Sequence, residues 1–438
     1  MSDRNIHSLT ALIAEHKKGR PVGIYSICSS NVFVLRAAIM KARRDGTPVL
    51  IESTSNQVNQ FGGYTGMTPD RFAGFTGEIA GKAGLSGDRI ILGGDHLGPN
   101  AWQGEDSRTA LSRARDLVHA YVTAGFTKIH IDVSMPCADD EQPLSDEVIA
   151  VRSADLCEVA EHAARKQPSG VSAPVYVIGT EVPVPGGARE DVGGLAVTRP
   201  EDVDRVIELT RDAFNDRGLE EAWERVIAVV VQPGFEFNST SVTGYDCEKA
   251  RPLARKIEEY EKLVYEAHST DYQTRKALRD MVENHFAILK VGPWLTFAFR
   301  EAVYALSYIE EELLTVKRGA VLSDIRAVIE RVMCENPKHW KNYYSGSAEE
   351  QALARKFSFS DRVRYYWPDS RIQRALETLT SNLSNTAIPL TLISQYLPVQ
   401  YEAVREGALS PMPEDLILHR ITVVLDHYSR ACGMDNIK

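Results

Sequence analysis

The sequence of 438 residues lacks most features of secreted, membrane and nucleic-acid-binding proteins. Its six cysteines are far apart and form no C-x-x-C pair, which argues against a disulfide framework and a thiolate zinc site. No run approaches the roughly 18 consecutive apolar residues that cross a bilayer, and the N-terminus lacks the basic-then-apolar order of a secretion signal. Lys and Arg (50) are fewer than Asp and Glu (60), without a basic block. We expect a soluble, cytoplasmic protein that binds neither membranes nor nucleic acids.

Three motifs of common enzyme classes are also missing. The sequence has no G-x-x-x-x-G-K-[ST] loop, which would cradle the phosphates of a nucleotide. It has no G-x-S-x-G elbow, and no dinucleotide-binding fingerprint follows its first predicted strand. These absences argue against a kinase built on that loop, a serine hydrolase and a Rossmann-type dehydrogenase.

What the sequence does contain is a regular alternation of strand and helix patterns. Short β-branched runs recur, and each is bounded by Gly, Pro or charged residues and followed by a helical pattern. The eight predicted strands are residues 22–28, 49–53, 90–95, 129–133, 175–181, 227–232, 264–268 and 288–292. Predicted helices between them include residues 32–44, 108–124, 154–165, 200–216 and 271–284. Eight such units predict an α/β fold, a closed (β/α)₈ TIM barrel, over residues 1–310.

Strand patterns stop after the eighth unit, and the last third of the chain is helical in pattern. The predicted helices there are residues 296–316, 322–333, 372–383, 389–396 and 413–432. Only Ser345-Gly346-Ser347 interrupts this region, and it is too short for a flexible linker between independent domains. We therefore predict a helical C-terminal extension, residues 311–438, packed on the barrel.

Titratable residues lie at the predicted C-terminal ends of the strands, where TIM barrels place their active sites. His96 and His268 offer imidazole nitrogens and Glu181 an oxygen to a divalent metal such as zinc or manganese, with substrate in the remaining positions; Gln232 is the weaker candidate for the third partner. A single histidine at a strand end is more often a structural, hydrogen-bonded imidazole, but two of them together with Asp95 and Glu181 on one rim favour a metal. Asp95 is placed for acid–base catalysis, unless it only accepts a hydrogen bond from a loop amide. Asp95 and Glu181 are the catalytic candidates.

Other polar residues at the same strand ends are candidates for binding a substrate. After the second and fourth strands these are Asn56, Gln57, Asp132 and Ser134. Lys290 lies on the eighth strand. A lysine there forms a Schiff base only if its pKa is depressed, so an ion pair with a rim carboxylate is the favoured interpretation.

Two segments are candidates for binding a phosphate group. Ser269 and Thr270 precede a helix predicted to begin near residue 271, whose free amides suit an anion, although helix capping explains them equally well. Arg362 and Arg364 lie among hydroxyl and aromatic residues, a combination that suits a phosphate or a sugar. The alternative for this second segment is a surface loop packed on the barrel.

Several long motifs resemble one known family over nearly the whole chain. They are NQVNQFGGYTG (residues 56–66), GGDHLGPN (93–100), GTEVPVPGG (179–187), HSTDYQ (268–273) and SDRVRYYW (360–367). On these motifs the chain closely resembles the GatZ/KbaZ family, the Z subunits of tagatose 1,6-bisphosphate aldolase. The resemblance implies a barrel related to the class II, metal-dependent aldolases and a role in galactitol or tagatose catabolism.

A more distant similarity links the chain to the catalytic class II aldolases. Four residues match the order of their motifs: Asp95, His96, Glu181 and His268. Gln232 stands where those enzymes have a histidine on strand six, and Gly292 and Trp294 replace an Asn and an Asp after strand eight. These differences argue against a complete three-histidine zinc site and against a second, C1 phosphate site.

The resemblance leaves two roles open. Z subunits are described as supporting a class II aldolase catalytic subunit, whereas related members are described as epimerases that invert C4 of ketohexoses or their 6-phosphates. A kinase label also occurs in the family, and the missing nucleotide motif argues against it. We predict a metal-dependent C4 epimerase that converts tagatose 6-phosphate to fructose 6-phosphate by aldol cleavage and re-formation. A non-catalytic aldolase subunit is the alternative, and a homo-oligomer is compatible with both.

Overall fold

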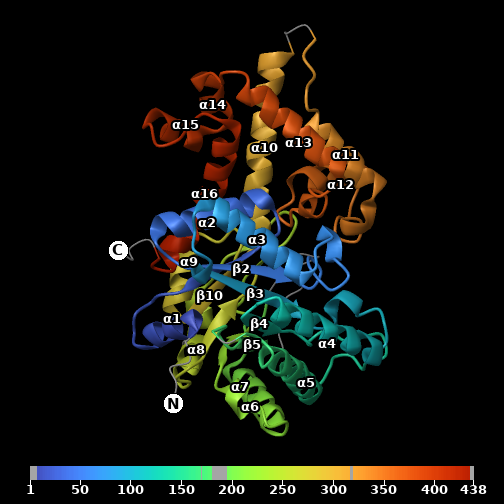
Figure 1. Ribbon diagram of the computed structural model, residues 1–438, viewed down its shortest axis with the longest axis vertical. Helices are drawn as coiled ribbons and strands as arrows, with labels where there is room; N and C mark the ends of the chain where they lie inside the picture. Colours follow the sequence, from blue (N-terminus) through green and yellow to red (C-terminus); the bar gives the residue numbers. More distant parts are fainter. Residues whose placement is uncertain (1–6, 169, 180–194, 316–318, 435–438) are drawn as a thin grey trace.

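Eight parallel strands form a closed barrel in the computed structural model, which describes residues 7–168, 170–179, 195–315 and 319–434 (Figure 1). The strands are β1 (Ile24–Cys28), β2 (Val49–Thr54), β3 (Ile90–Leu97), β4 (Lys128–Ile131), β5 (Val175–Gly179), β6 (Val226–Val230), β9 (Val264–Ala267) and β10 (Phe286–Val291). Around the barrel the order is β1-β10-β9-β6-β5-β4-β3-β2. The predicted TIM barrel is therefore confirmed, with strand boundaries moved by two residues at most.

Helices surround the barrel on its outer face. They are α1 (Ser8–Lys17), α2 (Val32–Asp45), α3 (Pro69–Ala83), α4 (Ser107–Thr123), α5 (Asp146–Ala164), α6 (Pro200–Asn215), α7 (Glu220–Trp223), α8 (Cys247–Glu258) and α9 (Arg275–Glu283). Local sequence fixes their ends: the Asn31 side chain caps the first amides of α2, and Gly46 ends that helix in the left-handed conformation (φ 71°). The helix predicted at 154–165 begins earlier, at Asp146, because Ser145 caps it.

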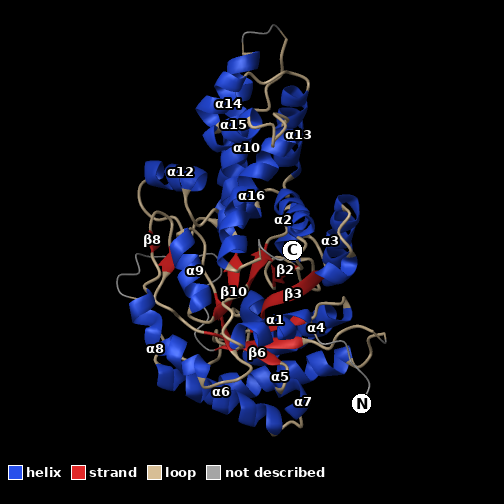
Figure 2. Cartoon of the chain, turned by 90° about the vertical axis from the view of Figure 1, so that its left-hand side faces the viewer, coloured by secondary structure: helices blue, strands red, loops and turns tan. Residues whose placement is uncertain are grey.

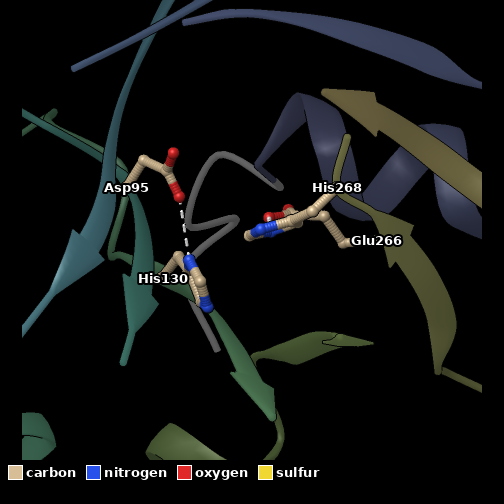
Figure 3. Close-up of side chains that lie close together, drawn as sticks. All are labelled: Asp95, His130, Glu266 and His268. Atoms are coloured by element: carbon tan, nitrogen blue, oxygen red, sulfur yellow. Dashed lines mark hydrogen bonds and ion pairs between the residues drawn. The ribbon is translucent and has the colours of Figure 1, made fainter. Parts of the chain in front are cut away.

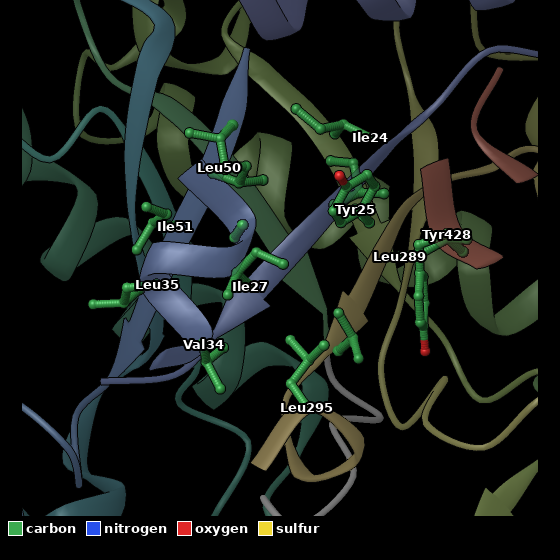
Figure 4. Packing of buried hydrophobic residues seen from close by; sticks show 14 of the residues in the cluster. Ile24, Tyr25, Ile27, Val34, Leu35, Leu50, Ile51, Leu289, Leu295 and Tyr428 are labelled. Atoms are coloured by element: carbon green, nitrogen blue, oxygen red, sulfur yellow. The ribbon is translucent and has the colours of Figure 1, made fainter. Parts of the chain in front are cut away.

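The hydrophobic core lies between the strands and the surrounding helices. Figure 4 shows Ile27 of β1, Ile51 of β2, Leu289 of β10 and Val34 of α2, which belong to one cluster of buried side chains. Fully burying one such aliphatic side chain contributes roughly 1.5–3 kcal/mol to folding. The apolar strand positions that face the helices therefore stabilise the barrel, which leaves the inward positions free for polar residues.

The C-terminal helices rise above the barrel in both views (Figures 1 and 2). They are α10 (Pro293–Leu314), α11 (Ile325–Glu335), α12 (Ala348–Phe357), α13 (Ser370–Ser384), α14 (Leu390–Tyr396), α15 (Pro398–Arg405) and α16 (Pro413–Ala431). Sequence patterns missed α12 and α15. The predicted interruption at residues 345–347 is the start of α12, where Ser347 and Glu350 form a capping box.

The last helix returns to the barrel wall. α16 packs on α2, α9 and α10 and contacts β1. The Tyr428 hydroxyl donates a hydrogen bond to the Thr270 carbonyl (2.9 Å), and its ring lies 6.1 Å from that of Tyr25 on β1. The end of the predicted extension thus covers the barrel between α9 and α2. The predicted division at residue 310 remains a prediction, and it falls within α10.

All six cysteines have free thiols. No helix among the described residues has the length and apolarity needed to span a membrane.

A small hairpin that the sequence patterns missed follows the sixth barrel strand. It pairs β7 (Glu236–Phe237) with β8 (Val242–Thr243) in antiparallel register. The hairpin places Glu236 beside the loop that follows β9, where its carboxylate accepts a hydrogen bond from Ser269 (3.1 Å).

Candidate active site

Charged side chains fill the interior of the barrel. Successive side chains of a strand point to opposite faces, so Lys128 and His130 of β4 face inward when Ile129 and Ile131 face the helices. Seven buried charged or imidazole side chains meet in this space: Glu52, Asp95, Lys128, His130, Glu266, His268 and Lys290. TIM barrels usually fill this space with branched apolar residues, so the polar interior indicates a function.

Two buried lysines neutralise the carboxylates. The Nζ of Lys128 lies 2.5 Å from Glu52 and 2.6 Å from Glu266. The Nζ of Lys290 lies 2.5 Å from Asp95 and 3.5 Å from Glu266, and it also contacts Glu52. Burial alone would lower the pKa of each lysine, but the carboxylates outweigh it and raise both pKa values. Both amines are therefore charged, and the network is held together by opposite charges across the barrel.

Three imidazoles form a triangle at the C-terminal end of this network. The ring centroids of His96, His130 and His268 are 5.0–5.2 Å apart. Figure 3 shows His130 beside Asp95, facing His268 and Glu266 across the barrel interior. One donor atom from each of the four side chains in Figure 3 lies within 4.8 Å of the other three. Such a set suits a divalent transition metal.

A carboxylate orients each imidazole. The three contacts are His96 Nδ1 to Asp132 (2.7 Å), His130 Nδ1 to Asp95 (2.9 Å) and His268 Nε2 to Glu266 (3.0 Å). Carboxylates in this position fix the tautomer and the direction of metal-binding histidines. The Nε2 atom of His130 is buried and has no hydrogen-bond partner among the described residues. It is therefore a free ligand atom.

Glycines let the backbone approach these side chains. A Cβ on Gly98 would lie 1.6 Å from the carbonyl oxygen of Asp132, so only glycine fits where β3 meets the end of β4. A Cβ on Gly93 would lie 2.6 Å from the Glu52 carboxylate. Between these glycines, His96 adopts a left-handed conformation (φ 48°), which is uncommon for a residue with a side chain. The glycines on either side of His96 thus allow the close backbone packing that the site requires.

Burial and close opposite charges set the charge states of the site. Burial alone would raise the pKa of Asp95, but His96, Lys290 and a hydrogen bond from His130 hold it well below its usual value. Burial lowers the pKa of His268 to about 3, so this imidazole is neutral at pH 7. Burial has the same effect on His96, but its two neighbouring aspartates outweigh it and raise the pKa. Asp95 is thus ionised and can accept a proton.

A cavity of about 1040 Å³ opens from this centre toward the C-terminal helices. Asp95, His96, His268 and Lys290 line one part of it, and residues of the C-terminal extension line another. The ring of Tyr64, after β2, meets that of Tyr365 from the extension at 4.7 Å. The extension therefore forms part of the wall of the candidate site.

Most of the side chains predicted from the sequence line this cavity. They are Asp95, His96, His268, Lys290, Asn56, Gln57, Ser269, Arg362 and Arg364. Lys290 pairs with carboxylates, as favoured from the sequence. Since its amine is protonated, the structure gives no support to a Schiff base.

Gln232 and Glu181 were also predicted as metal ligands. Gln232 is absent from the described residues that line the cavity, and its Oε1 accepts the N–H of Gly234 (2.9 Å). Glu181 lies outside the described residues, so its predicted catalytic and ligand roles remain predictions.

Three predicted substrate-binding residues are not among the described residues that line the cavity. Asp132 holds His96, and Ser134 donates a hydrogen bond to Asp132 (2.7 Å). The Thr270 hydroxyl donates to the carbonyl of Lys290 (2.5 Å). The helix expected to begin near residue 271 begins at Arg275, with Thr274 as its cap, so Thr270 does not precede free helix amides. The prediction that Thr270 precedes the free amides of a helix beginning near residue 271 was therefore wrong.

Four residues of the charged interior were not predicted from the sequence. They are Glu52, Lys128, His130 and Glu266. A signal was present: Lys128, His130 and Asp132 alternate along one strand, and Glu266 stands two residues before His268. Alternation of this kind puts the side chains on one face of the strand, inside a barrel.

Glu236 should make the stability of the protein depend on pH. Burial raises the pKa of its carboxyl from about 4.5 to about 7. Since the folded state holds this proton more tightly than the unfolded chain, Glu236 makes stability fall as pH rises from about 4.5 to about 7. Glu236→Gln should therefore stabilise the protein at pH 8 by up to roughly 3 kcal/mol and have little effect at pH 4. Urea unfolding at both pH values measures the difference, and an equal effect at both would contradict it.

The chain is similar to several known proteins. A family model described as D-tagatose-1,6-bisphosphate aldolase subunit GatZ/KbaZ-like matches residues 9–433. A crystal structure described as a probable tagatose 6 phosphate kinase from Sinorhizobium meliloti 1021 is 46% identical, with a TM-score of 0.85, and the match covers 94% of this chain and 100% of the other. The YdjI aldolase from Escherichia coli K12 is 12% identical, with a TM-score of 0.41 and coverage of 87% and 99%. The fructose-bisphosphate aldolase Fba from Campylobacter jejuni is 13% identical, with a TM-score of 0.44 and coverage of 85% and 90%.

Proposed function

Because the chain belongs to the GatZ/KbaZ-like family of D-tagatose-1,6-bisphosphate aldolase subunits, we propose that it carries out aldolase-type chemistry as a C4 epimerase. The reaction converts tagatose 6-phosphate to fructose 6-phosphate. The observation that carries the proposal is an ionised Asp95 beside three buried imidazoles at a cavity large enough for a sugar phosphate. A purely supporting subunit has no need of this arrangement.

A divalent metal, zinc or manganese, fits the residues of the site. His130, His268 and Glu266 would hold it, because donor atoms from these residues lie within 4.8 Å of one another, and the imidazole of His96 lies beside them, with ring centroids 5.0–5.2 Å apart. The buried Nε2 atom of His130, which has no hydrogen-bond partner among the described residues, supports this assignment. A metal bound there would polarise the carbonyl group of the substrate.

The charge of the site also favours a divalent cation. Four carboxylates lie buried around the imidazoles: Glu52, Asp95, Asp132 and Glu266. Among the described residues they face two buried lysines, Lys128 and Lys290, so two negative charges remain when the imidazoles are neutral. Buried charge is unfavourable unless it is paired, and a divalent cation balances this excess.

Asp95 starts and ends the proposed reaction. It accepts the proton of the C4 hydroxyl group, the C3–C4 bond breaks, and the sugar separates into an enediolate and an aldehyde. Rotation of the aldehyde presents its other face to the enediolate. The bond re-forms and Asp95 returns the proton, which leaves C4 inverted. The cavity retains both fragments between the two steps, so the enzyme acts as an aldolase that does not release its products.

Turnover should depend on a metal. We expect the purified chain alone, loaded with zinc or manganese, to convert tagatose 6-phosphate to fructose 6-phosphate. Treatment with a chelator should abolish the activity, because the carbonyl is then no longer polarised, and the metal should restore it. A coupled assay for fructose 6-phosphate measures both effects. Full activity after verified removal of the metal would contradict this part of the proposal.

The family description is also compatible with a second candidate function, that of a non-catalytic subunit of a class II aldolase. No turnover by the metal-loaded chain, together with a higher activity of a separate aldolase subunit on mixing, would favour it. Consumption of ATP with tagatose 6-phosphate would instead support the kinase description of the Sinorhizobium meliloti protein for this chain.

A further inference from the structure

The usual phosphate position of a TIM barrel is already filled in this chain. That position lies at the loops after the seventh and eighth strands, where the first amides of the next helix bind the anion. Here those strands are β9 and β10, and α10 follows. The N–H groups of Gly292 and Trp294 both donate to the Asp271 carboxylate, at 3.0 and 2.7 Å. Pro293, between them, has no N–H. An internal carboxylate thus takes the place of a phosphate.

The hydroxyl groups of the same loops are also engaged. Ser269 donates to the carboxylate of Glu236 (3.1 Å), and Thr270 donates to the carbonyl of Lys290 (2.5 Å). Glu236 and Asp271 are both buried, and a phosphate at this position would meet their carboxyl groups without a balancing cation from these loops. The barrel loops therefore disfavour a phosphate group.

We propose that Arg362, from the C-terminal extension, holds the phosphate group of the sugar substrate. This inference rests on the proposed function only in taking the ligand to be a sugar phosphate. Arg362 is 2% exposed and lines the same cavity as Asp95 and His268. Its Nη1 donates to the carbonyl of His339 (3.0 Å) and the Tyr365 hydroxyl lies close to the guanidinium, but its Nε and Nη2 are buried and form no well-aligned hydrogen bond among the described residues. A buried guanidinium with two free N–H groups is suited to a phosphate.

The fold fixes Arg362 through the residue before it. Asp361 adopts a left-handed conformation (φ 43°), and its carboxylate is bound by Arg300 (2.8 Å) and Thr296 (2.6 Å) of α10. All three partners are buried. This ion pair ties the loop that carries Arg362 to the first helix after the barrel. The cationic group is therefore positioned before any ligand arrives.

No carboxylate is found paired with Arg362 among the described residues. The guanidinium lies over the ring of Tyr343, an interaction that only partly replaces an anion. Burial lowers the pKa of Arg362, as expected for a cation without a nearby negative charge. Arg364 lines the same cavity and adds a second positive charge. A phosphate dianion between these groups would supply the missing counter-charge.

Calorimetric titration of the full chain tests the assignment. In an Asp95→Asn background, which slows turnover, tagatose 6-phosphate should bind more tightly than tagatose. Adding Arg362→Met should weaken the binding of tagatose 6-phosphate roughly ten- to a hundredfold, which is the effect of losing hydrogen bonds to a charged group. Affinity for tagatose should stay the same. Arg362→Lys should recover part of the loss, since lysine restores the positive charge but lacks the planar, forked N–H donors of arginine.

Two further variants serve as controls. Arg374→Met removes an exposed arginine of α13 and should leave the affinity for both sugars unchanged. Ser269→Ala should also leave the preference for the phosphorylated sugar intact. Melting curves establish that each variant is folded. If Arg362→Met does not fold, the comparison of Arg362→Lys with the native residue serves as the test.

Several outcomes would overturn the assignment. They are an unchanged preference for tagatose 6-phosphate in folded Arg362 variants, loss of that preference in Ser269→Ala, and a chain that binds neither tagatose 6-phosphate nor inorganic phosphate. Binding of tagatose 6-phosphate that depends on Arg362, in a chain whose native form shows no epimerase activity, would support the phosphate site and contradict the proposed function alone.

Discussion

Replacing Asp95 with asparagine should lower the turnover of tagatose 6-phosphate by roughly 10²- to 10⁴-fold, the usual contribution of an acid–base group. Asparagine keeps the size of the side chain but cannot accept the proton of the C4 hydroxyl group. Binding of tagatose 6-phosphate should change far less than turnover, because the sugar's phosphate and hydroxyl contacts remain. Steady-state kinetics and calorimetry on the same preparation separate the two effects.

The variant should still fold. In the native protein Lys290 contacts Glu52 as well as Asp95, so it keeps a carboxylate partner when Asp95 becomes an amide. Asp88→Asn is a matched control: it makes the same chemical change just before the other end of β3, where the side chain is exposed. Asp88→Asn should leave turnover unchanged. Folded Asp95→Asn with turnover within tenfold of the native enzyme would argue against an acid–base role for this residue.

The barrel was predictable because its signals are local. Each strand is a short β-branched run, and each helix carries its own caps, as Asn31 and Gly46 do for α2. The start of α9 was misplaced because the stretch from Ser269 to Gln273 looks like a helix N-terminus in sequence. Its conformation depends on partners far along the chain, such as Tyr428 and Gly292.

The candidate site was predictable only where it lies at strand ends. Asp95, His96 and His268 stand at those ends, and the parallel arrangement brings the ends together. His130 and Glu266 stand inside strands, where alternation places them in the barrel interior but does not reveal their partners: Asp95 of the neighbouring β3 for His130, and Lys128 of β4 for Glu266. Arg362 was a candidate from its residue type, but its burial and free N–H groups are properties of the packed extension.

Lys128→Met should destabilise the protein by about 3–5 kcal/mol, the effect of removing one partner from a buried ion pair. Lys128 lies between Glu52 and Glu266, and all three side chains are 0% exposed. Methionine fills a similar volume but leaves the two carboxylates without this cation, and Lys290 alone then faces both of them. Urea unfolding of the native chain and the variant measures the difference in the free energy of unfolding.

The origin of the effect can be separated from a loss of packing. If the unpaired charge causes the instability, adding Glu266→Gln to Lys128→Met should recover part of the loss, because one buried charge disappears with its partner. Lys262→Met is the matched control: Lys262 pairs with Glu224 where both side chains are more than half exposed, and its loss should change stability by less than about 1 kcal/mol. A double variant no more stable than Lys128→Met would instead assign the loss to packing, and the charged interior would then contribute to function rather than to folding.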